Sequence, residues 1–472
     1  MYKGFEATIG LEVHAELKTE TKVFCACSAA FGGEPNTQCC PVCMGMPGAL
    51  PMLNEKAVEY AVRAGLAFVC RIAEVSWFDR KNYFYPDLPK GYQITQAQSP
   101  FCVGGEVQLR GLGYEKSVRL RQIHLEEDAG KLIHTAEGTL IDYNRCGVPL
   151  IEIVSEPDIR DANEAKAYLN ELRRVLLFLG VSDCKMNEGS LRCDVNVSVR
   201  RPGEPHGERC EVKNLNSVSY VGKAVEYEIR RQVELILSGG TVAKETRRFN
   251  EDTGETETMR RKESAVDYRY FTEPNIPPVR LSAEYVESVK RQMPIMPDEA
   301  RRNLTERFGV GEETAAQITQ LPKIYRFFLR TAEITRYPLK AANLYVGEVL
   351  TVCGEEQDSY ITAEHLAETA DLFGNERITA NVAKQLIRLS AETGESPCVI
   401  AEREGLFRIR DEATLLPLIK ESIEASPKAL QDYRKGKETA KKTFLGYVMR
   451  ATGGRADAAY CELLLDKVLG EE

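Results

Sequence analysis

Two pairs of cysteines near the N-terminus have the spacing of a metal site. Cys25 and Cys27 form the first pair. Cys40 and Cys43 form the second, with Cys39 as an alternative member, although the Cys-x-x-Cys spacing favours Cys40. Four thiolates can surround one Zn²⁺ tetrahedrally, and such a closed site is structural because no position stays open for a substrate. The sequence therefore predicts a structural zinc site, with four unrelated buried thiols as the alternative.

A second candidate site begins on a predicted strand over residues 8–17, where polar and apolar residues alternate. The polar face of this strand carries Glu12, His14 and Glu16. Two carboxylates and an imidazole on one face are suitable ligands for a divalent cation. Taken alone, this strand is more typical of an ordinary solvated surface.

Other predicted strands add to the acidic character of this face. Alternation places His124 and Glu126 on one polar face, and Glu127 joins them if the strand ends there. Further polar positions come from two later strands: Asp194, Glu211 and Lys213. Carboxylates gathered on one sheet repel one another unless a cation neutralises them, and Mg²⁺ prefers oxygen ligands. We therefore predict a catalytic Mg²⁺ site here, with a surface salt-bridge network as the alternative.

Basic and aromatic side chains suggest that a nucleotide could bind near these acids. Arg192, Arg200 and Lys213 are candidates for phosphate contacts, and residues 78–93 interleave tyrosines with basic residues, as stacking on a base requires. The sequence contains neither a Walker-type phosphate loop nor a dinucleotide glycine fingerprint. A bound ATP would therefore be held by a metal and basic side chains on a sheet.

The C-terminal segment has the opposite charge to the chain as a whole. The net charge is −9, yet residues 428–455 contain eight basic and two acidic residues. A local basic surface of this kind suits the phosphate backbone of a nucleic acid, with a solvated helix face as the alternative. The candidate contacts are Lys435, Lys437, Lys441, Lys442, Arg450 and Arg455.

The elements that position these residues predict an α+β fold followed by helices. Residues 1–292 combine short alternating strands with helices at 163–179 and 218–237. Residues 293–405 are mostly helical, and residues 406–472 are helical and more basic. A chain of 472 residues exceeds the size of one hydrophobic core, so we expect three domains with these boundaries.

Composition indicates a globular enzyme, with 43% hydrophobic and 28% charged residues. We expect a cytoplasmic protein without a membrane segment, because the sequence shows neither a signal peptide nor a long apolar run. Thiols stay reduced in that compartment, so the 14 cysteines favour metal binding or packing over disulfides.

Several strings read together resemble one family, the B subunits of aspartyl/glutamyl-tRNA amidotransferases. The strings are IGLEVH (9–14), FDRKNYFYPD (78–87), HLEEDAGK (124–131), VPLIEIVSEPD (148–158), EGSLRCD (188–194) and KNLN (213–216). The resemblance covers the whole chain, and residues 446–455 resemble the family's tRNA-contacting tail. It implies a cradle domain with an antiparallel sheet, related to glutamine synthetase, followed by an all-α domain and a small tail domain. It also implies that Glu12, His14 and either Glu126 or Glu127 bind Mg²⁺.

The resemblance further implies a heterotrimer with two partners, an amidase that releases ammonia from glutamine and a small third protein. The chain would use ATP to phosphorylate the side-chain carboxylate of mischarged Glu-tRNA(Gln) or Asp-tRNA(Asn), and ammonia would then displace phosphate. The complex would be a ligase that forms a carbon–nitrogen bond with glutamine as amido donor. Which mischarged tRNA is the substrate stays open. The alternative is a zinc-containing tRNA-binding scaffold without chemistry of its own.

Overall fold

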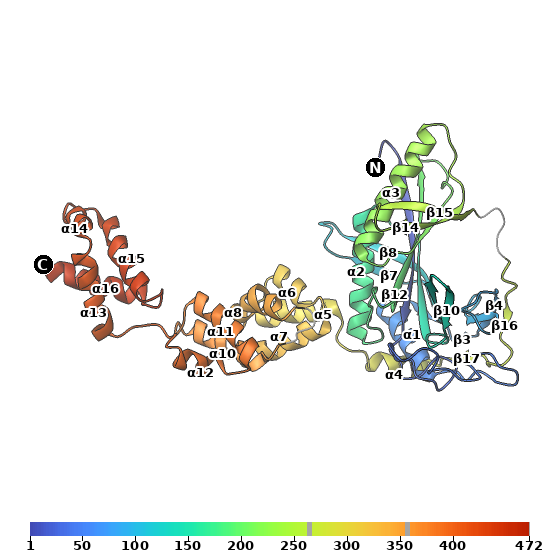
Figure 1. Ribbon diagram of the computed structural model, residues 1–472, viewed down its shortest axis with the longest axis horizontal. Coiled ribbons are helices and arrows are strands. Elements are labelled where there is room, and N and C mark those ends of the chain that lie inside the picture. Colours follow the sequence, from blue (N-terminus) through green and yellow to red (C-terminus); the bar gives the residue numbers. More distant parts are fainter. Residues whose placement is uncertain (262–266, 355–358, 472) are drawn as a thin grey trace. The chain divides into compact units, whose positions relative to one another are not determined.

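The computed structural model describes residues 1–261, 267–354 and 359–471 (Figure 1). The chain divides into two compact units, Met1–Met296 and Pro297–Glu472. Among the described residues, no helix combines the length and apolar character that crossing a membrane requires.

Unit 1 is built on a large sheet that is antiparallel except for one parallel pair, β13 with β14. Its strands run in the spatial order β15-β14-β13-β12-β1-β11-β8-β6-β2, and β7 pairs with β8. In chain order these strands are β1 (Glu6–Glu16), β2 (Arg71–Ile72), β6 (Cys102–Val103), β7 (Glu106–Leu109), β8 (Lys116–Glu127), β11 (Pro149–Ser155), β12 (Leu191–Arg200), β13 (Cys210–Lys213), β14 (Glu245–Asn250) and β15 (Glu255–Arg261). This spatial order places residues that are far apart in the sequence on neighbouring strands.

The central strand β1 has one apolar and one polar face because its side chains alternate. Ile9, Leu11 and Val13 are buried in the main core, whereas Glu12 and His14 lie on the opposite face and are half-buried. Helices α2 (Ala162–Leu179) and α3 (Val218–Leu237) pack against the sheet, as Figure 1 shows. They confirm the two helices expected in this region, and the mixed α/β architecture agrees with the α+β prediction.

Local sequence explains where the helices of unit 1 begin. The Asp161 side chain accepts hydrogen bonds from two backbone N–H groups of α2, and Ser217 caps α3 in the same way with one. Asn54 caps α1 (Glu55–Ala67). A further helix, α4 (Ala283–Arg291), begins after Ser282.

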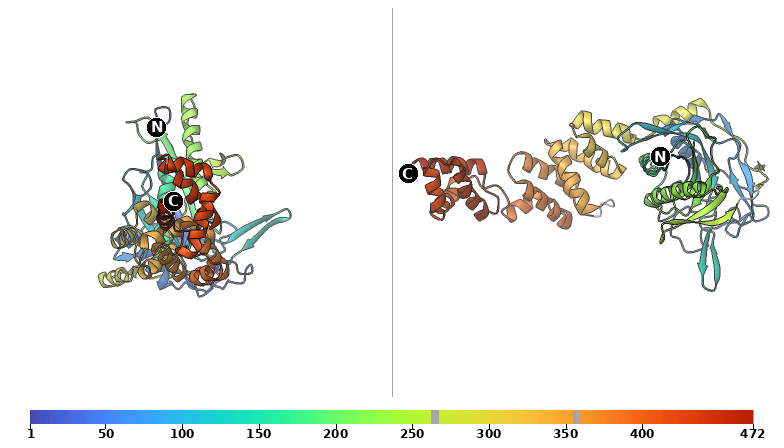
Figure 2. Two further views of the ribbon diagram at one scale, coloured as in Figure 1. Left: turned by 90° about the vertical axis from the view of Figure 1, so that its left-hand side faces the viewer. Right: turned by 90° about the horizontal axis from the view of Figure 1, so that it is seen from above.

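Three small sheets complete unit 1. One has the order β16-β4-β5, and the others are the pairs β10-β9 and β17-β3. Their bounds are β3 (Val75–Ser76), β4 (Asp79–Asn82), β5 (Tyr92–Thr95), β9 (Lys131–Thr135), β10 (Gly138–Asp142), β16 (Phe271–Thr272) and β17 (Val279–Arg280). The β9–β10 hairpin projects from the body of the unit in both views of Figure 2.

Unit 2 consists of helices, and its described residues contain no strand. The bounds are α5 (Pro297–Arg302), η1 (Asn303–Arg307), α6 (Glu312–Ile318), α7 (Pro322–Ile334), α8 (Pro338–Leu344), η2 (Tyr345–Val349), α9 (Leu350–Cys353), α10 (Ala363–Gly374), α11 (Ala380–Thr393), α12 (Pro397–Arg403), α13 (Glu412–Glu424), α14 (Pro427–Arg434), η3 (Glu438–Ala440), α15 (Lys441–Ala451) and α16 (Ala458–Glu471). Helices α13, α15 and α16 share a core of their own, which includes Leu415, Phe444 and Leu465.

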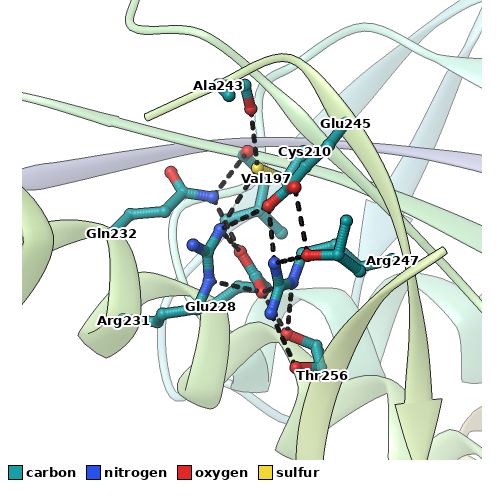
Figure 3. A network of polar contacts seen from close by, with 10 residues as sticks. Val197, Cys210, Glu228, Arg231, Gln232, Ala243, Glu245, Arg247 and Thr256 are labelled. Carbon is teal, nitrogen blue, oxygen red and sulfur yellow. Dashed lines mark hydrogen bonds and ion pairs between the residues drawn. The ribbon is translucent and has the colours of Figure 1, made fainter. Parts of the chain in front are cut away.

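A buried ionic network fixes α3 to the β13–β15 end of the sheet (Figure 3). Glu228 on α3 is fully buried and accepts a hydrogen bond from Arg231 Nη2 at 2.8 Å and one from Gln232 Nε2 at 2.9 Å. Arg247 Nε on β14 lies 3.0 Å from Glu228 Oε1, and the hydroxyl of Thr256 on β15 donates to the same carboxylate. Because these partners come from three different elements, Glu228 ties the helix to two strands.

We expect Glu228→Gln to lower the free energy of unfolding of unit 1 by about 3 to 5 kcal/mol, because it removes part of the counter-charge of the buried Arg247 and the half-buried Arg231. Urea unfolding followed by the fluorescence of Trp77, the only tryptophan of the sequence, measures this unit. Glu226→Gln is the matched control, since Glu226 is exposed on the same helix. Equal stabilities of the two variants would contradict the prediction.

Candidate functional site

Three neighbouring strands bring two histidines and two glutamates together on the polar face of the sheet. His14 on β1 is opposite Glu152 on β11, which is in turn opposite His124 on β8. Glu152 Oε2 lies 3.5 Å from His14 Nε2 and 3.2 Å from His124 Nε2. Glu126 Oε1 lies 3.9 Å from His14 Nε2. One ligand atom each of His14, Glu126 and Glu152 lies within 4.8 Å of the others, as binding of one cation requires.

The charges of this first cluster depend on burial and on close partners. Burial disfavours a charged imidazole, but Glu152 and Glu126 outweigh it and raise the pKa of His124 to about 10. Burial likewise opposes the charge of His14, and the hydrogen bond with Glu152 still raises its pKa. Burial also acts on Glu152, yet attraction by His124 and its hydrogen bonds with both histidines hold its pKa well below the usual range. Glu152 is therefore an ionised carboxylate between two basic side chains.

A second group of carboxylates adjoins the first on the other side of β1. Glu12 is opposite Asp194 on β12, and Glu211 on β13 completes a set whose ligand atoms lie within 4.8 Å of one another. Lys213 Nζ lies 3.0 Å from Glu211 Oε1 and also pairs with Asp194. Asn196 Nδ2 donates to Glu12 Oε1 at 3.0 Å. Burial and the neighbouring carboxylates Glu152, Asp194 and Glu211 raise the pKa of Glu12, so this group favours a bound cation.

A polar cavity of about 450 Å³ joins the two groups. His14 and Glu126 line it from the first group, and Asp194 and Lys213 line it from the second. Lys81 lies in the same cavity, 5.0 Å above the ring of Tyr268. The cavity therefore presents clustered acids beside basic groups, an arrangement that can hold a divalent cation together with an anion.

The structure separates several predicted residues from this cavity. Glu127 lies on the other face of β8, where it is buried, pairs with Lys90 and accepts a hydrogen bond from the backbone N–H of Ile94 at 2.8 Å. The strand ends at Glu127, but the side chain does not turn towards His14. Arg200 is also outside the group, because it pairs with Glu6 at 2.6 Å near the far end of β1.

One residue of the site, Glu152, was missed by the sequence predictions. Glu152 is the only charged residue in the run from Val148 to Val154, and that single charge in an apolar strand was a usable signal. Lys81 was predicted as one of the basic residues of 78–93 that could neutralise phosphate, and it lines the cavity. Arg192, predicted to bind phosphate, lines the cavity but donates to Asp128 Oδ2 at 2.6 Å.

The four predicted zinc ligands lie together in the loops before α1. One sulfur atom each of Cys25, Cys27, Cys40 and Cys43 lies within 4.8 Å of the others. Cys40 Sγ and Cys43 Sγ are 3.9 Å apart, close to the separation of about 3.8 Å that follows from tetrahedral Zn–S bonds of about 2.3 Å. Cys39 is outside the group and lies 3.9 Å from Asn144 Oδ1. The donor set therefore fits Zn²⁺, with Cys40 as the member of the second pair.

The basic residues of the tail have different surroundings. Four of the six candidates are exposed: Lys435, Lys437, Lys442 and Arg450. Lys437 Nζ lies 3.3 Å from Asp432 Oδ1, and Lys441 Nζ lies 2.5 Å from Asp466 Oδ1. Arg455 Nε donates to the backbone carbonyl of Thr452 at 3.1 Å. Lys435, Lys442 and Arg450, which are exposed and take no part in these ion pairs, are therefore the best placed for an external phosphate.

Comparison with known proteins gives matches over most of the chain. Residues 7–287 match the family model of the GatB/GatE catalytic domain, and residues 326–469 match that of the GatB domain. A relative from Caldanaerobacter subterraneus subsp. tengcongensis is 48% identical over 99% of this chain and 100% of its own length. One from Caldicellulosiruptor saccharolyticus is 45% identical over 99% of both chains. Each of the two is named as the B subunit of an aspartyl/glutamyl-tRNA(Asn/Gln) amidotransferase.

We expect His124 to remain protonated at pH 8 in the metal-free chain, because its pKa in the folded state is about 10. Its contribution to stability should be complete below the unfolded pKa of about 6.5 and be lost as the pH rises towards 10. Nuclear magnetic resonance titration of the histidine side chains measures this directly. Glu152→Gln should lower the pKa of His124, and a wild-type His124 that titrates below pH 7 would contradict the assignment.

Proposed function

This chain belongs to the B-subunit family of the aspartyl/glutamyl-tRNA(Asn/Gln) amidotransferases, and we propose that it activates a carboxylate carried by tRNA. The observation that carries the proposal is the convergence of two acidic groups on one polar cavity, within the segment that matches the catalytic domain. The substrate would be Glu-tRNA(Gln) or Asp-tRNA(Asn), and the product would be Gln-tRNA(Gln) or Asn-tRNA(Asn).

The proposed reaction has two steps. A side-chain carboxylate oxygen of the mischarged tRNA attacks the γ-phosphorus of ATP, which forms an acyl phosphate and releases ADP. Ammonia then attacks the acyl carbon, phosphate leaves with the electrons of the broken C–O bond, and ammonia loses a proton to give the amide. The first step is needed because a free carboxylate has no good leaving group.

The residues of the cavity have distinct proposed roles. His14, Glu126 and Glu152 would hold Mg²⁺, and Glu12, Asp194 and Glu211 offer a second set of oxygen ligands. When bound, Mg²⁺ would neutralise phosphate charge that otherwise opposes attack. Lys213 and Lys81 would bind phosphate oxygens. His124 would act as a positioning residue, because its imidazolium holds the Glu152 carboxylate in place.

Partners and the remaining segments complete the proposal. Ammonia would come from glutamine hydrolysis in a partner amidase, within a heterotrimer that also contains a small third protein. Residues 1–292 would form the glutamine-synthetase-like cradle, residues 293–405 a helical domain, and residues 406–472 the tail domain that contacts tRNA. Zn²⁺ held by the four clustered cysteines would stabilise the loops before α1.

We expect His14→Ala to reduce ATP-dependent amidation by at least about 100-fold, because loss of a metal ligand removes several kcal/mol of charge stabilisation. The heterotrimer is assayed with ammonium in place of glutamine, so that the glutamine-hydrolysing step is bypassed. His134→Ala is the matched control, since His134 is exposed on the β9–β10 hairpin. Binding of tRNA should be unchanged in both variants, and full turnover by His14→Ala would contradict the proposed site.

The cysteine cluster and the basic tail also suit a second function, a tRNA-binding scaffold whose chemistry lies in its partners. The purified chain distinguishes the two functions when it receives mischarged tRNA, ATP and ammonium without the amidase. Consumption of ATP that depends on the mischarged tRNA supports the enzyme. Binding of tRNA without ATP consumption supports the scaffold.

The tail is tested by its contribution to salt-dependent tRNA binding. We expect the triple variant Lys435→Ala, Lys442→Ala and Arg450→Ala to make the slope of log K against log salt shallower by up to about 3, because each lost phosphate contact removes a released counterion. Lys384→Ala on α11 is the control, since Lys384 is exposed outside the tail segment. A slope that stays at the wild-type value in the triple variant would exclude the tail from binding.

A further inference from the structure

A buried lysine lies directly against the cysteine cluster. Lys22 follows β1 in the chain, and its side chain has no exposed surface. Its ammonium group donates to the backbone carbonyl of Gln38 at 2.7 Å and contacts that of Tyr143 at 3.5 Å. The third contact is Cys43 Sγ at 3.7 Å. The ammonium group therefore contacts two neutral carbonyl oxygens and one sulfur atom.

The charge of Lys22 lacks the usual kind of partner. Within the described ranges of the chain, none of the ion pairs with Asp or Glu involves Lys22, although the largely buried basic groups of Lys90 and Arg247 each have such a partner. A buried ammonium is expensive unless a negative charge lies nearby, and carbonyl dipoles supply only part of that compensation. The remaining candidate for an anion in contact with Nζ is the thiolate of Cys43.

The cysteine cluster has an excess of negative charge, which complements the positive charge of Lys22. Four thiolates around one Zn²⁺ carry net negative charge, which is unfavourable in a buried loop unless hydrogen bonds or cations reach the sulfurs. The backbone N–H of Cys40 donates to Cys43 Sγ at 3.2 Å, and Lys22 approaches the same sulfur from another direction. Cys43 is also the buried member of the four.

We propose that Lys22 is the buried counter-ion of the zinc site and acts through the thiolate of Cys43. The inference rests on the zinc site proposed above and adds a residue that does not itself bind the metal. Lys22 joins the second cysteine pair to the loop around Tyr143, so its charge couples zinc binding to the packing of two loops. The alternative is a purely hydrogen-bonding role, in which Lys22 holds Gln38 and Tyr143 in place and its charge does not affect zinc binding.

The two roles differ in their effect on zinc affinity. In the full-length chain, we expect Lys22→Met to weaken zinc binding by about 10- to 100-fold, the usual effect of losing a group that supports a metal ligand. Competition with a chromogenic chelator measures the affinity. Lys18→Met is the matched control, because Lys18 is an exposed lysine on the same segment and its removal changes the net charge equally.

A second variant separates charge from hydrogen bonding. Lys22→Gln removes the same charge but retains a donor, so the counter-ion role predicts the same loss of affinity as Lys22→Met. Wild-type affinity in Lys22→Gln would overturn the proposal in favour of the purely hydrogen-bonding role.

Substitution of a fully buried residue also affects the stability of the fold itself. The melting temperature of each variant is therefore measured in zinc-loaded and zinc-depleted forms. The proposal predicts a larger decrease in the zinc-loaded form, and equal decreases in the two forms would overturn it.

Cobalt substitution gives a readout that is independent of stability. A cation next to a thiolate stabilises its lone pairs, so loss of Lys22 should shift the sulfur-to-cobalt charge-transfer band to lower energy. An unshifted band in a variant that still binds cobalt would overturn the counter-ion role. A wild-type chain that binds neither metal would overturn the zinc site itself, which distinguishes that failure from one confined to Lys22.

Discussion

Repulsion among carboxylates on one face of the sheet is the constraint on which the candidate site depends. Glu126 and Glu152 come from two strands on one side of β1, and Asp194 and Glu211 come from two strands on the other. Glu12 lies between them on β1 itself. So much negative charge in a half-buried position is unfavourable without compensation. The protein supplies some of this compensation through histidines and Lys213, and a divalent cation would supply more.

The opposite face of the sheet explains how this arrangement withstands that repulsion. On β13, Glu211 and Lys213 lie on the polar face of the sheet, whereas Cys210 and Val212 are buried on the face that α3 covers. Arg231 of α3 donates to Cys210 Sγ at 3.3 Å, within the same network that contains Glu228. The ionic network on the helical side therefore helps to fix the backbone of β13, from which Glu211 and Lys213 project.

Alternation along single strands was enough to predict part of this site. It placed His14 and Glu126 on polar faces, and the two-residue cysteine spacing selected Cys40 over Cys39 in agreement with the observed cluster. The pairing between strands could not be predicted, because β8, β11 and β12 are separated by long connections and their register depends on tertiary packing. Glu152 was missed for this reason, since the single charge in its strand does not reveal the two histidines on either side of it. The orientation of Glu127 also depended on a partner, Lys90, that sequence patterns do not reveal.

In the proposed mechanism, side chains from separate strands converge on a cation that holds the triphosphate. A crystal structure of the chain, in the proposed heterotrimer, with a non-hydrolysable ATP analogue and Mn²⁺ measures this, with anomalous data collected for the metal. We expect an anomalous peak within about 2.3 Å of His14 and of carboxylate oxygens of Glu126 and Glu152, with the γ-phosphate beside it. A triphosphate and metal bound elsewhere, with these three side chains in contact with neither, would contradict it.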